Sequence, residues 1–164
     1  MDVHVNDVEY NYNRVQELLT QALAECPDII VLPETWNTGF HPSKDLINIS
    51  DRNGERTKAL LSAFSKEHNV NIVGGSVAVA KEDLIFNTSY AYNREGTLVG
   101  EYSKMHGFSP AKENQYFASG THTTHFELDG IPCSTVICYD IRFPELVRMA
   151  ALSNTELLFV PAQW

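Results

Sequence analysis

Basic residues are scarce in this sequence of 164 residues, which has 12 Lys and Arg against 21 Asp and Glu and a formal net charge of -9. No stretch of the chain gathers the Lys and Arg residues into a patch that could follow a phosphate backbone. The shortage of positive charge therefore argues against nucleic acid as a partner.

Long apolar runs are missing as well. No segment approaches the roughly 18 to 20 apolar residues that a membrane helix needs. The first residues carry no basic region followed by an apolar one, the pattern of a secretory leader. We therefore expect a cytoplasmic protein that does not enter a membrane.

Cysteine is also rare, with only Cys26, Cys133 and Cys138 in the chain. An odd number of cysteines at irregular spacings argues against a disulfide framework and for free thiols in a reducing compartment, where one thiol can do chemistry. Together with His122 and His125, the last two cysteines match no common zinc spacing. We therefore expect no metal site.

The remaining composition, 43% hydrophobic and 20% charged residues, indicates one compact domain over residues 1–164. Apolar residues at three- and four-residue steps predict helices over residues 11–25, around 59–64 and over 144–152. Turn residues predict loops over 37–53 and 105–120. The expected strands cover residues 28–33, 70–80, 87–93, 98–103, 126–128, 131–137 and 157–160. This alternation predicts an α/β protein with helices packed on a mixed sheet.

Cys138 is the first candidate for chemistry because it closes an apolar strand and precedes a helix. A side chain at such a turn is presented at the edge of the sheet, and the backbone N–H groups that enter the helix point toward an oxyanion formed beside it. The alternative is a small core residue, since free cysteine is among the most buried residue types.

Glu34 and Lys104 each follow a predicted strand directly. Open α/β sheets place their ligands at the carboxyl ends of strands, so a carboxylate and an ammonium at these positions are candidates for a site. The alternatives are a solvated loop glutamate and a surface lysine. Neither residue is decisive by itself.

Three separated segments in a fixed order make the sequence similar to a known family. The segments are VLPETWNTGF at residues 31–40, YSKMH at 102–106 and ICYDIRFPE at 137–145. Together they resemble the glutamate, lysine and cysteine segments of the nitrilase superfamily of carbon–nitrogen hydrolases. The similarity extends over essentially the whole chain, including residues 74–76 and 160–164.

The resemblance implies an αββα sandwich and a catalytic set. Glu34 would be the base, Cys138 the nucleophile and Lys104 the stabiliser of the oxyanion, together with the backbone N–H of Tyr139. Glu113, in the segment KENQYF, matches a second glutamate of many members and would position the substrate or water. His106, which follows the lysine segment, would organise the loop rather than act as a base.

The family normally begins with a strand ahead of this chain and continues well past its last residue. We therefore expect a carbon–nitrogen hydrolase domain that is incomplete at both ends. The missing parts would complete the pocket and the interface of a homodimer.

The implied reaction is the hydrolysis of a small carboxamide to a carboxylate and ammonia through a thioester, without a cofactor. The sequence most resembles the omega-amidase branch, which acts on 2-oxo acid amides. N-carbamoyl amino acid hydrolysis and aliphatic amide hydrolysis need the same residues and are alternatives. A different alternative is a non-catalytic binding module on the same fold.

Arg142 is a candidate for binding the carboxylate of such a substrate, because it lies four residues after Cys138 and its planar guanidinium can bind a carboxylate bidentately. The alternative is a structural role in which Arg142 pairs with Asp140 or Glu145 and braces the turn.

Overall fold

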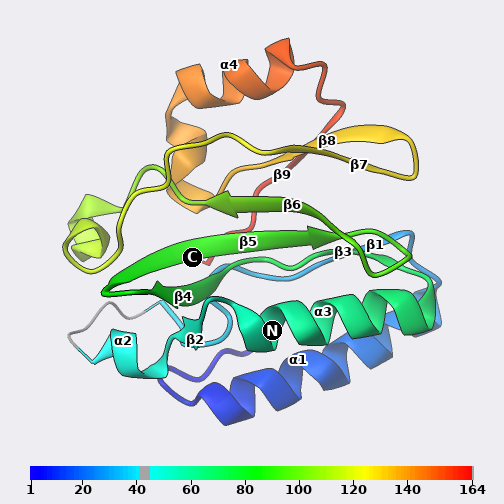
Figure 1. The fold of residues 1–164 in the computed structure, drawn as a ribbon, viewed down its shortest axis with the longest axis horizontal. Coiled ribbons are helices and arrows are strands. Elements are labelled where there is room, and N and C mark those ends of the chain that lie inside the picture. The colour runs from blue at the N-terminus through cyan, green and yellow to red at the C-terminus, as the bar shows by residue number, and fades with distance from the viewer. Residues whose placement is uncertain (41–44, 164) are drawn as a thin grey trace.

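The computed structural model describes residues 1–40 and 45–163, and its helices and strands form four layers (Figure 1). Helices α1 (Val8–Ala22) and α3 (Glu55–His68) cover one face of a six-stranded sheet. A three-stranded sheet faces the other side, and α4 (Pro144–Leu152) covers the outside of that second sheet. The αββα sandwich expected from the resemblance is thereby confirmed.

The larger sheet has the order β1-β3-β5-β4-β2, with β6 paired to β5, and the smaller sheet has the order β7-β8-β9. β1 is parallel to β3, β2 is parallel to β4, and β8 is parallel to β9. The strands are β1 (Ile29–Val31), β2 (Asp51–Arg52), β3 (Asn71–Val73), β4 (Val77–Lys81), β5 (Leu84–Tyr92), β6 (Leu98–Ser103), β7 (His125–Leu128), β8 (Ile131–Thr135) and β9 (Leu157–Phe159).

Two apolar clusters hold the layers together. The first joins the helices to the larger sheet and is built on the fully buried side chains of Val15, Leu19 and Leu61. The second lies between the two sheets and includes Phe126 and Cys133. Cys133 is therefore a core thiol, as free cysteines commonly are.

The expected first helix, residues 11–25, begins earlier than predicted. Asp7 accepts a hydrogen bond from Tyr10 N at 3.1 Å and caps α1, which starts at Val8. The last residues form the 3-10 turn Leu23–Glu25, and Cys26 ends it in the left-handed region at φ 49°. Within the described residues, no helix combines the length and the apolar character needed to cross a bilayer.

The prediction of one strand over residues 70–80 is wrong, because Gly74–Ser76 interrupts it between β3 and β4. Both strands pair with the same strand, β5. At the interruption, the segment after β1 enters the sheet: Ser76 N donates to Pro33 O at 3.0 Å, and Ser76 Oγ accepts from Thr35 N at 2.9 Å. The break therefore holds the segment that carries Glu34.

Several boundaries and connections also differ from the predictions. The expected loop over residues 37–53, of which 41–44 lie outside the described residues, contains the short helix α2 (Leu46–Ile49) and β2. β5 starts before residue 87, and β8 ends before residue 137. The expected loop over 105–120 contains the 3-10 turns η2 (Ser109–Ala111) and η3 (Glu113–Gln115). These elements are too short to leave a periodic pattern in the sequence.

Arg94, in the turn between β5 and β6, ties the two sheets together at one end. Its guanidinium donates to Asp28 at 2.8 Å and to Asp129, in the β7–β8 turn, at 2.7 Å. Asn71 Nδ2 of β3 donates to the same Asp129 carboxylate at 2.8 Å. Because these carboxylates already bind the Arg94 guanidinium, the role of Arg94 is structural.

We predict that Gly75→Ala lowers the free energy of unfolding by about 2 kcal/mol or more, measured by urea denaturation of the full-length protein. Gly75 has φ +60°, and an added Cβ would lie 2.0 Å from Pro33 O. Gly130→Ala is the matched control, since φ is +80° but nothing lies within 4 Å of the added Cβ. Losses of equal size in the two variants would contradict the prediction.

Candidate active site

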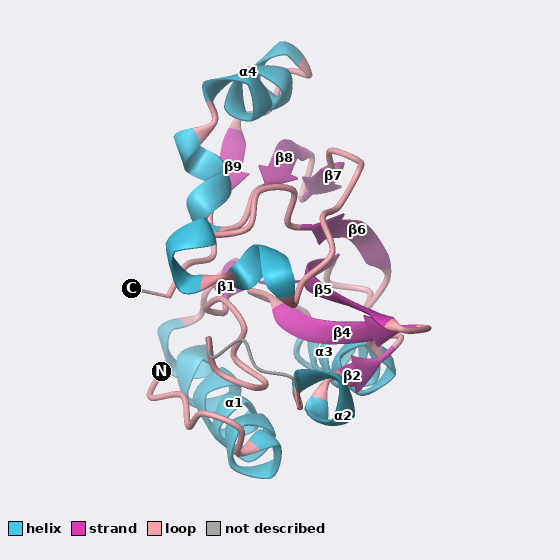
Figure 2. Ribbon diagram, turned by 90° about the vertical axis from the view of Figure 1, so that its left-hand side faces the viewer, coloured by secondary structure: helices cyan, strands magenta, loops and turns pink. Residues whose placement is uncertain are grey.

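Glu34, Lys104 and Cys138 line one cavity of about 680 Å³. Glu34 follows β1, Lys104 directly follows β6, and Cys138 opens the 3-10 helix η4 (Cys138–Arg142) after β8. These strands end on the side of the molecule that faces the viewer in Figure 2. The complete lining consists of Glu34, Phe40, Lys104, Phe108, Ala111, Cys138, Tyr139, Arg142 and Gln163.

The Lys104 ammonium lies between two buried carboxylates. Lys104 Nζ is 2.8 Å from Glu34 Oε1 and 2.9 Å from Glu113 Oε2, and all three side chains are at most 3% exposed. Glu113, in the long loop after β6, is therefore brought together with the other predicted residues.

Burial by itself disfavours the charged form of Lys104, but the carboxylates of Glu34 and Glu113 outweigh this effect and raise the pKa of the ammonium. Lys104 is therefore a permanent cation at neutral pH. Such a cation can stabilise negative charge that develops on a bound carbonyl oxygen.

A backbone N–H group also binds each of the two carboxylates. Glu34 Oε2 accepts from Gln163 N at 3.1 Å, and Glu113 Oε2 accepts from Phe108 N at 2.7 Å. Gln163 is held in turn by its side-chain Oε1, which accepts from Phe40 N at 3.0 Å. The sequence predicts no role for Gln163 or Phe108, because the hydrogen bonds that they donate to the carboxylates come from backbone N–H groups.

Cys138 adopts the left-handed region, with φ 45°, at the turn from strand to 3-10 helix. Its N–H donates to Pro161 O at 2.9 Å, and its side chain packs with Tyr102 and Ile137. The strained backbone agrees with the elbow expected at this position, since non-glycine residues rarely adopt this conformation.

Burial, followed by the charge of Glu34 and its hydrogen bond to the thiol, raises the pKa of Cys138 to about 11. Lys104 acts in the opposite direction and lowers this pKa, because a neighbouring cation favours the thiolate. Because the raising effects are larger, the thiol of the free protein is neutral. Use of this sulfur as a nucleophile would therefore require a base that removes the proton.

Tyr139 and Arg142 both border the cavity. Tyr139 is the second residue of η4, and the N–H groups in the first turn of a helix have no acceptor within that helix. The structural alternative required an ion pair between Arg142 and Asp140 or Glu145. Among the described residues, no such ion pair is present. The exposed Arg142 side chain is therefore available to the cavity.

Asp140 is fully buried and binds the lysine segment to the cysteine segment. It accepts from Tyr102 Oη at 2.7 Å and from His106 N at 2.9 Å, on either side of Lys104. It also accepts from Ile137 N at 3.1 Å, next to Cys138. His106 Nδ1 lies 2.8 Å from the same carboxylate, which agrees with its expected role in organising the loop.

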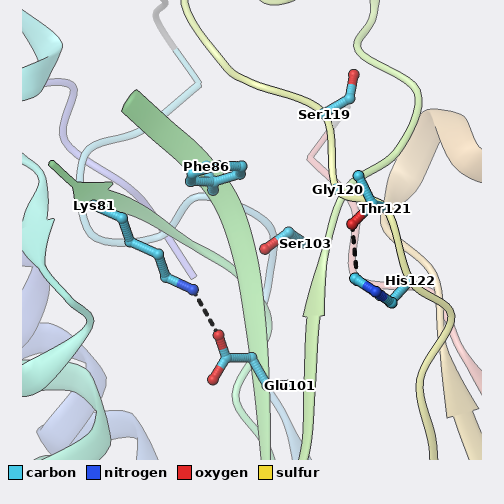
Figure 3. A pocket seen from close by; sticks show the side chains of 8 residues that line it. All are labelled: Lys81, Phe86, Glu101, Ser103, Ser119, Gly120, Thr121 and His122. Atoms are coloured by element: carbon cyan, nitrogen blue, oxygen red, sulfur yellow. Dashed lines mark hydrogen bonds and ion pairs between the residues drawn. The ribbon is translucent and has the colours of Figure 1, made fainter. Parts of the chain in front are cut away.

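A second hollow, of about 500 Å³, lies on β4, β5, β6 and the segment before β7 (Figure 3). Its lysine, Lys81, is paired with Glu101 at 2.8 Å, and Thr121 Oγ1 contacts His122 Nδ1. None of the predicted site residues lines it. Over residues 1–40 and 45–163, no group of three or more His, Cys, Asp or Glu residues is placed to hold a metal ion.

The chain belongs to the carbon–nitrogen hydrolase family, whose profile matches residues 1–164. It is 41% identical over 137 residues to the 2-oxoglutaramate amidase of Bacillus subtilis, covering 84% of this chain and 52% of the relative. It is 36% identical over 139 residues to the "Hydrolase in agr operon" of Staphylococcus aureus, covering 84% and 53%.

Solved structures share the fold. An amidase from Nesterenkonia sp. matches with a TM-score of 0.86 at 22% identity, covering 98% of this chain and 61% of the neighbour. A carbon–nitrogen hydrolase from Helicobacter pylori matches with a TM-score of 0.88 at 22% identity, covering 99% and 57%. The chain thus spans about half to three fifths of the length of these proteins. The homodimer and the cytoplasmic location stay predictions.

We predict that alkylation of Cys138 by iodoacetamide accelerates about tenfold per pH unit from about pH 7 to about pH 10, because only the thiolate reacts. The pKa of about 11 places the midpoint of thiolate formation above this range. Peptide mapping by mass spectrometry measures the rate, and Cys138→Ser controls for Cys26 and Cys133. A rate that levels off below about pH 9 would contradict the raised pKa.

Proposed function

We propose that the full-length protein is a cysteine-dependent amidase that hydrolyses a small carboxamide to a carboxylate and ammonia through a thioester. The observation that carries this proposal is the single cavity that Cys138 shares with Glu34 and Lys104, whose ammonium lies 2.8 Å from the Glu34 carboxylate. The amidase names of relatives support it. In one Nesterenkonia amidase structure, acrylamide has added to the active-site cysteine.

In the first step, Glu34 takes the proton of the Cys138 thiol while the sulfur attacks the carbonyl carbon of the amide. The carbonyl oxygen becomes an oxyanion. Lys104 Nζ and the N–H of Tyr139 stabilise it, each by about 3 to 4 kcal/mol if well placed. The raised pKa of the thiol suits this order of events, since the proton leaves only when a substrate is present.

In the second step, the tetrahedral intermediate collapses and its carbon–nitrogen bond breaks. Glu34 returns the proton to the departing nitrogen, which leaves as ammonia, and a thioester remains on Cys138. Glu34 then takes a proton from water, and the hydroxide attacks the thioester carbon. Glu34 returns this proton to the departing sulfur, and the product is released as a carboxylic acid that ionises to the carboxylate in water. Glu113, fixed by Lys104 and Phe108, positions the substrate or this water.

A 2-oxo acid amide is the favoured substrate. The Bacillus subtilis relative is named a 2-oxoglutaramate amidase, and Arg142 at the edge of the cavity offers a planar cation for a carboxylate. N-carbamoyl amino acids and aliphatic amides are the alternatives, because they need the same catalytic groups and differ in what the cavity lining must bind. A non-catalytic module would show no turnover of any of them.

We predict that Cys138→Ala and Cys138→Ser abolish amide hydrolysis by the full-length protein, because the nucleophile is lost. Cys26→Ser and Cys133→Ser are the controls and should retain most of the activity, since neither thiol lines the cavity. Ammonia release from a panel of small amides is the measurement. Undiminished activity of the Cys138 variants would contradict the proposed reaction.

We predict that Arg142→Lys raises KM for anionic amides by about tenfold or more, and raises KM for neutral amides of equal size by less than about twofold. Lysine keeps the charge but cannot reproduce the two parallel hydrogen bonds of a guanidinium. Steady-state kinetics on matched pairs of substrates measures the difference. Equal losses on both substrates, with a lower melting temperature, would assign Arg142 to the scaffold.

A further inference from the structure

We infer that Asn87 is a positioning residue for the proposed reaction: its side-chain amide joins the Glu34 and Glu113 carboxylates and holds both beside the Lys104 ammonium. The inference rests on the proposed function, and it adds a residue that is neither a nucleophile, a base nor a cation. Asn87 lies within β5 and is 1% exposed.

Asn87 closes a ring of hydrogen bonds with the charged groups. Its Nδ2 donates to Glu34 Oε1 at 3.0 Å and to Glu113 Oε1 at 3.1 Å. Lys104 Nζ donates to the same two oxygens at 2.8 and 3.1 Å. Two nitrogens and two oxygens therefore alternate around the ring, and each oxygen accepts from both nitrogens.

An amide is well matched to this position. Two carboxylates face a single ammonium, so a second cation would be needed to neutralise them and a further anion would repel them. The amide nitrogen brings two protons and no charge, one proton for each carboxylate. A hydroxyl brings only one proton, and an apolar side chain brings none. Asn87 thus adds two donors to the cluster without changing its net charge.

The cost of this arrangement also argues for a specific role. Within the described residues, Asn87 Oδ1 is buried and has no hydrogen-bond partner. An unpaired buried acceptor is destabilising, and native structures rarely keep one without a reason. The opposite orientation of the amide would point its oxygen at two carboxylate oxygens. The two charge-assisted bonds therefore fix the orientation and leave Oδ1 without a donor.

The main chain fixes Asn87 relative to the catalytic lysine. Lys104 N donates to Asn87 O at 2.8 Å, so the amide and the ammonium extend from two backbone positions that are bonded to each other. On its other side, Asn87 pairs with Ala78 of β4. The central strand therefore sets where the two carboxylates meet.

Asn71 of β3 provides a matched comparison. It is also fully buried, its Nδ2 also donates to a carboxylate, that of Asp129, and its Oδ1 is also without a partner in the described chain. It differs from Asn87 in donating to none of the proposed catalytic groups, because its partners are Asp28 and Asp129. An effect of Asn87 that Asn71 does not reproduce is therefore not a general effect of removing a buried asparagine.

The test compares Asn87→Leu, which keeps a similar volume, and Asn87→Ala with Asn71→Ala in the full-length protein. Both Asn87 variants should lower kcat about tenfold or more, with KM changed less than about twofold, because the base loses its placement. The acidic limb of the kcat/KM profile should move up by about one pH unit, since hydrogen bonds to a carboxylate favour its charged form. Asn71→Ala should lower the melting temperature and leave kcat and the limb unchanged.

Difference infrared spectroscopy separates this inference from the proposed function, because it follows proton uptake by buried carboxylates without turnover. The ionisable groups around Asn87 and its partners are Lys104, Glu34, Glu113 and Cys138. In Asn87→Leu, the carboxyl signal should appear at a pH about one unit higher than in the unaltered protein. If the unaltered protein hydrolyses amides but the carboxyl signal of Asn87→Leu does not shift, the inference is wrong. If the carboxyl signal shifts but the unaltered protein hydrolyses no amide, the proposed function alone is wrong.

Discussion

The site depends on one buried cation that must serve two buried carboxylates. Removing ions from water is costly, and a charge inside a protein persists only if partners surround it. Glu34 and Glu113 together need more donors than the Lys104 ammonium can supply, and the remainder come from Asn87, Phe108 and Gln163. These residues belong to β5, to the long loop and to the segment after β9. The carboxylates thus require elements from both sheets to meet at one point.

Neighbouring charges also determine the protonation of the Cys138 thiol. Burial and the neighbouring Glu34 carboxylate raise the pKa of Cys138 by more than the Lys104 ammonium lowers it, so the sulfur keeps its proton. A thiol held in this state reacts slowly with passing electrophiles. In the proposed reaction, the thiol becomes reactive only when a substrate carbonyl lies between the sulfur and the N–H donors of Lys104 and Tyr139, which stabilise the negative charge that forms on its oxygen.

The sequence pattern was enough to single out side chains with distinctive chemistry near the ends of strands, such as Glu34 and Cys138, and to predict an α/β protein, while the layers of the sandwich came from the family resemblance. It was not enough for groups whose role depends on distant contacts. Gln163 contributes a backbone N–H, which every residue but proline has. Asn87 was read only as part of a strand. At the break between β3 and β4, Gly75 lies against Pro33 O, a contact between distant residues that the sequence does not reveal.

The contact between Gln163 N and Glu34 Oε2 joins positions 129 residues apart. Synthesis on the ribosome proceeds from the amino terminus, so the glutamate emerges long before the residue that orients it. A nascent chain that already contains β1 through η4 has Lys104 and Cys138, but Glu34 lacks one of its donors until residues 160–163 have left the exit tunnel. Assembly of the site is therefore one of the last events in the synthesis of this part of the protein, which delays its chemistry until the two sheets have come together.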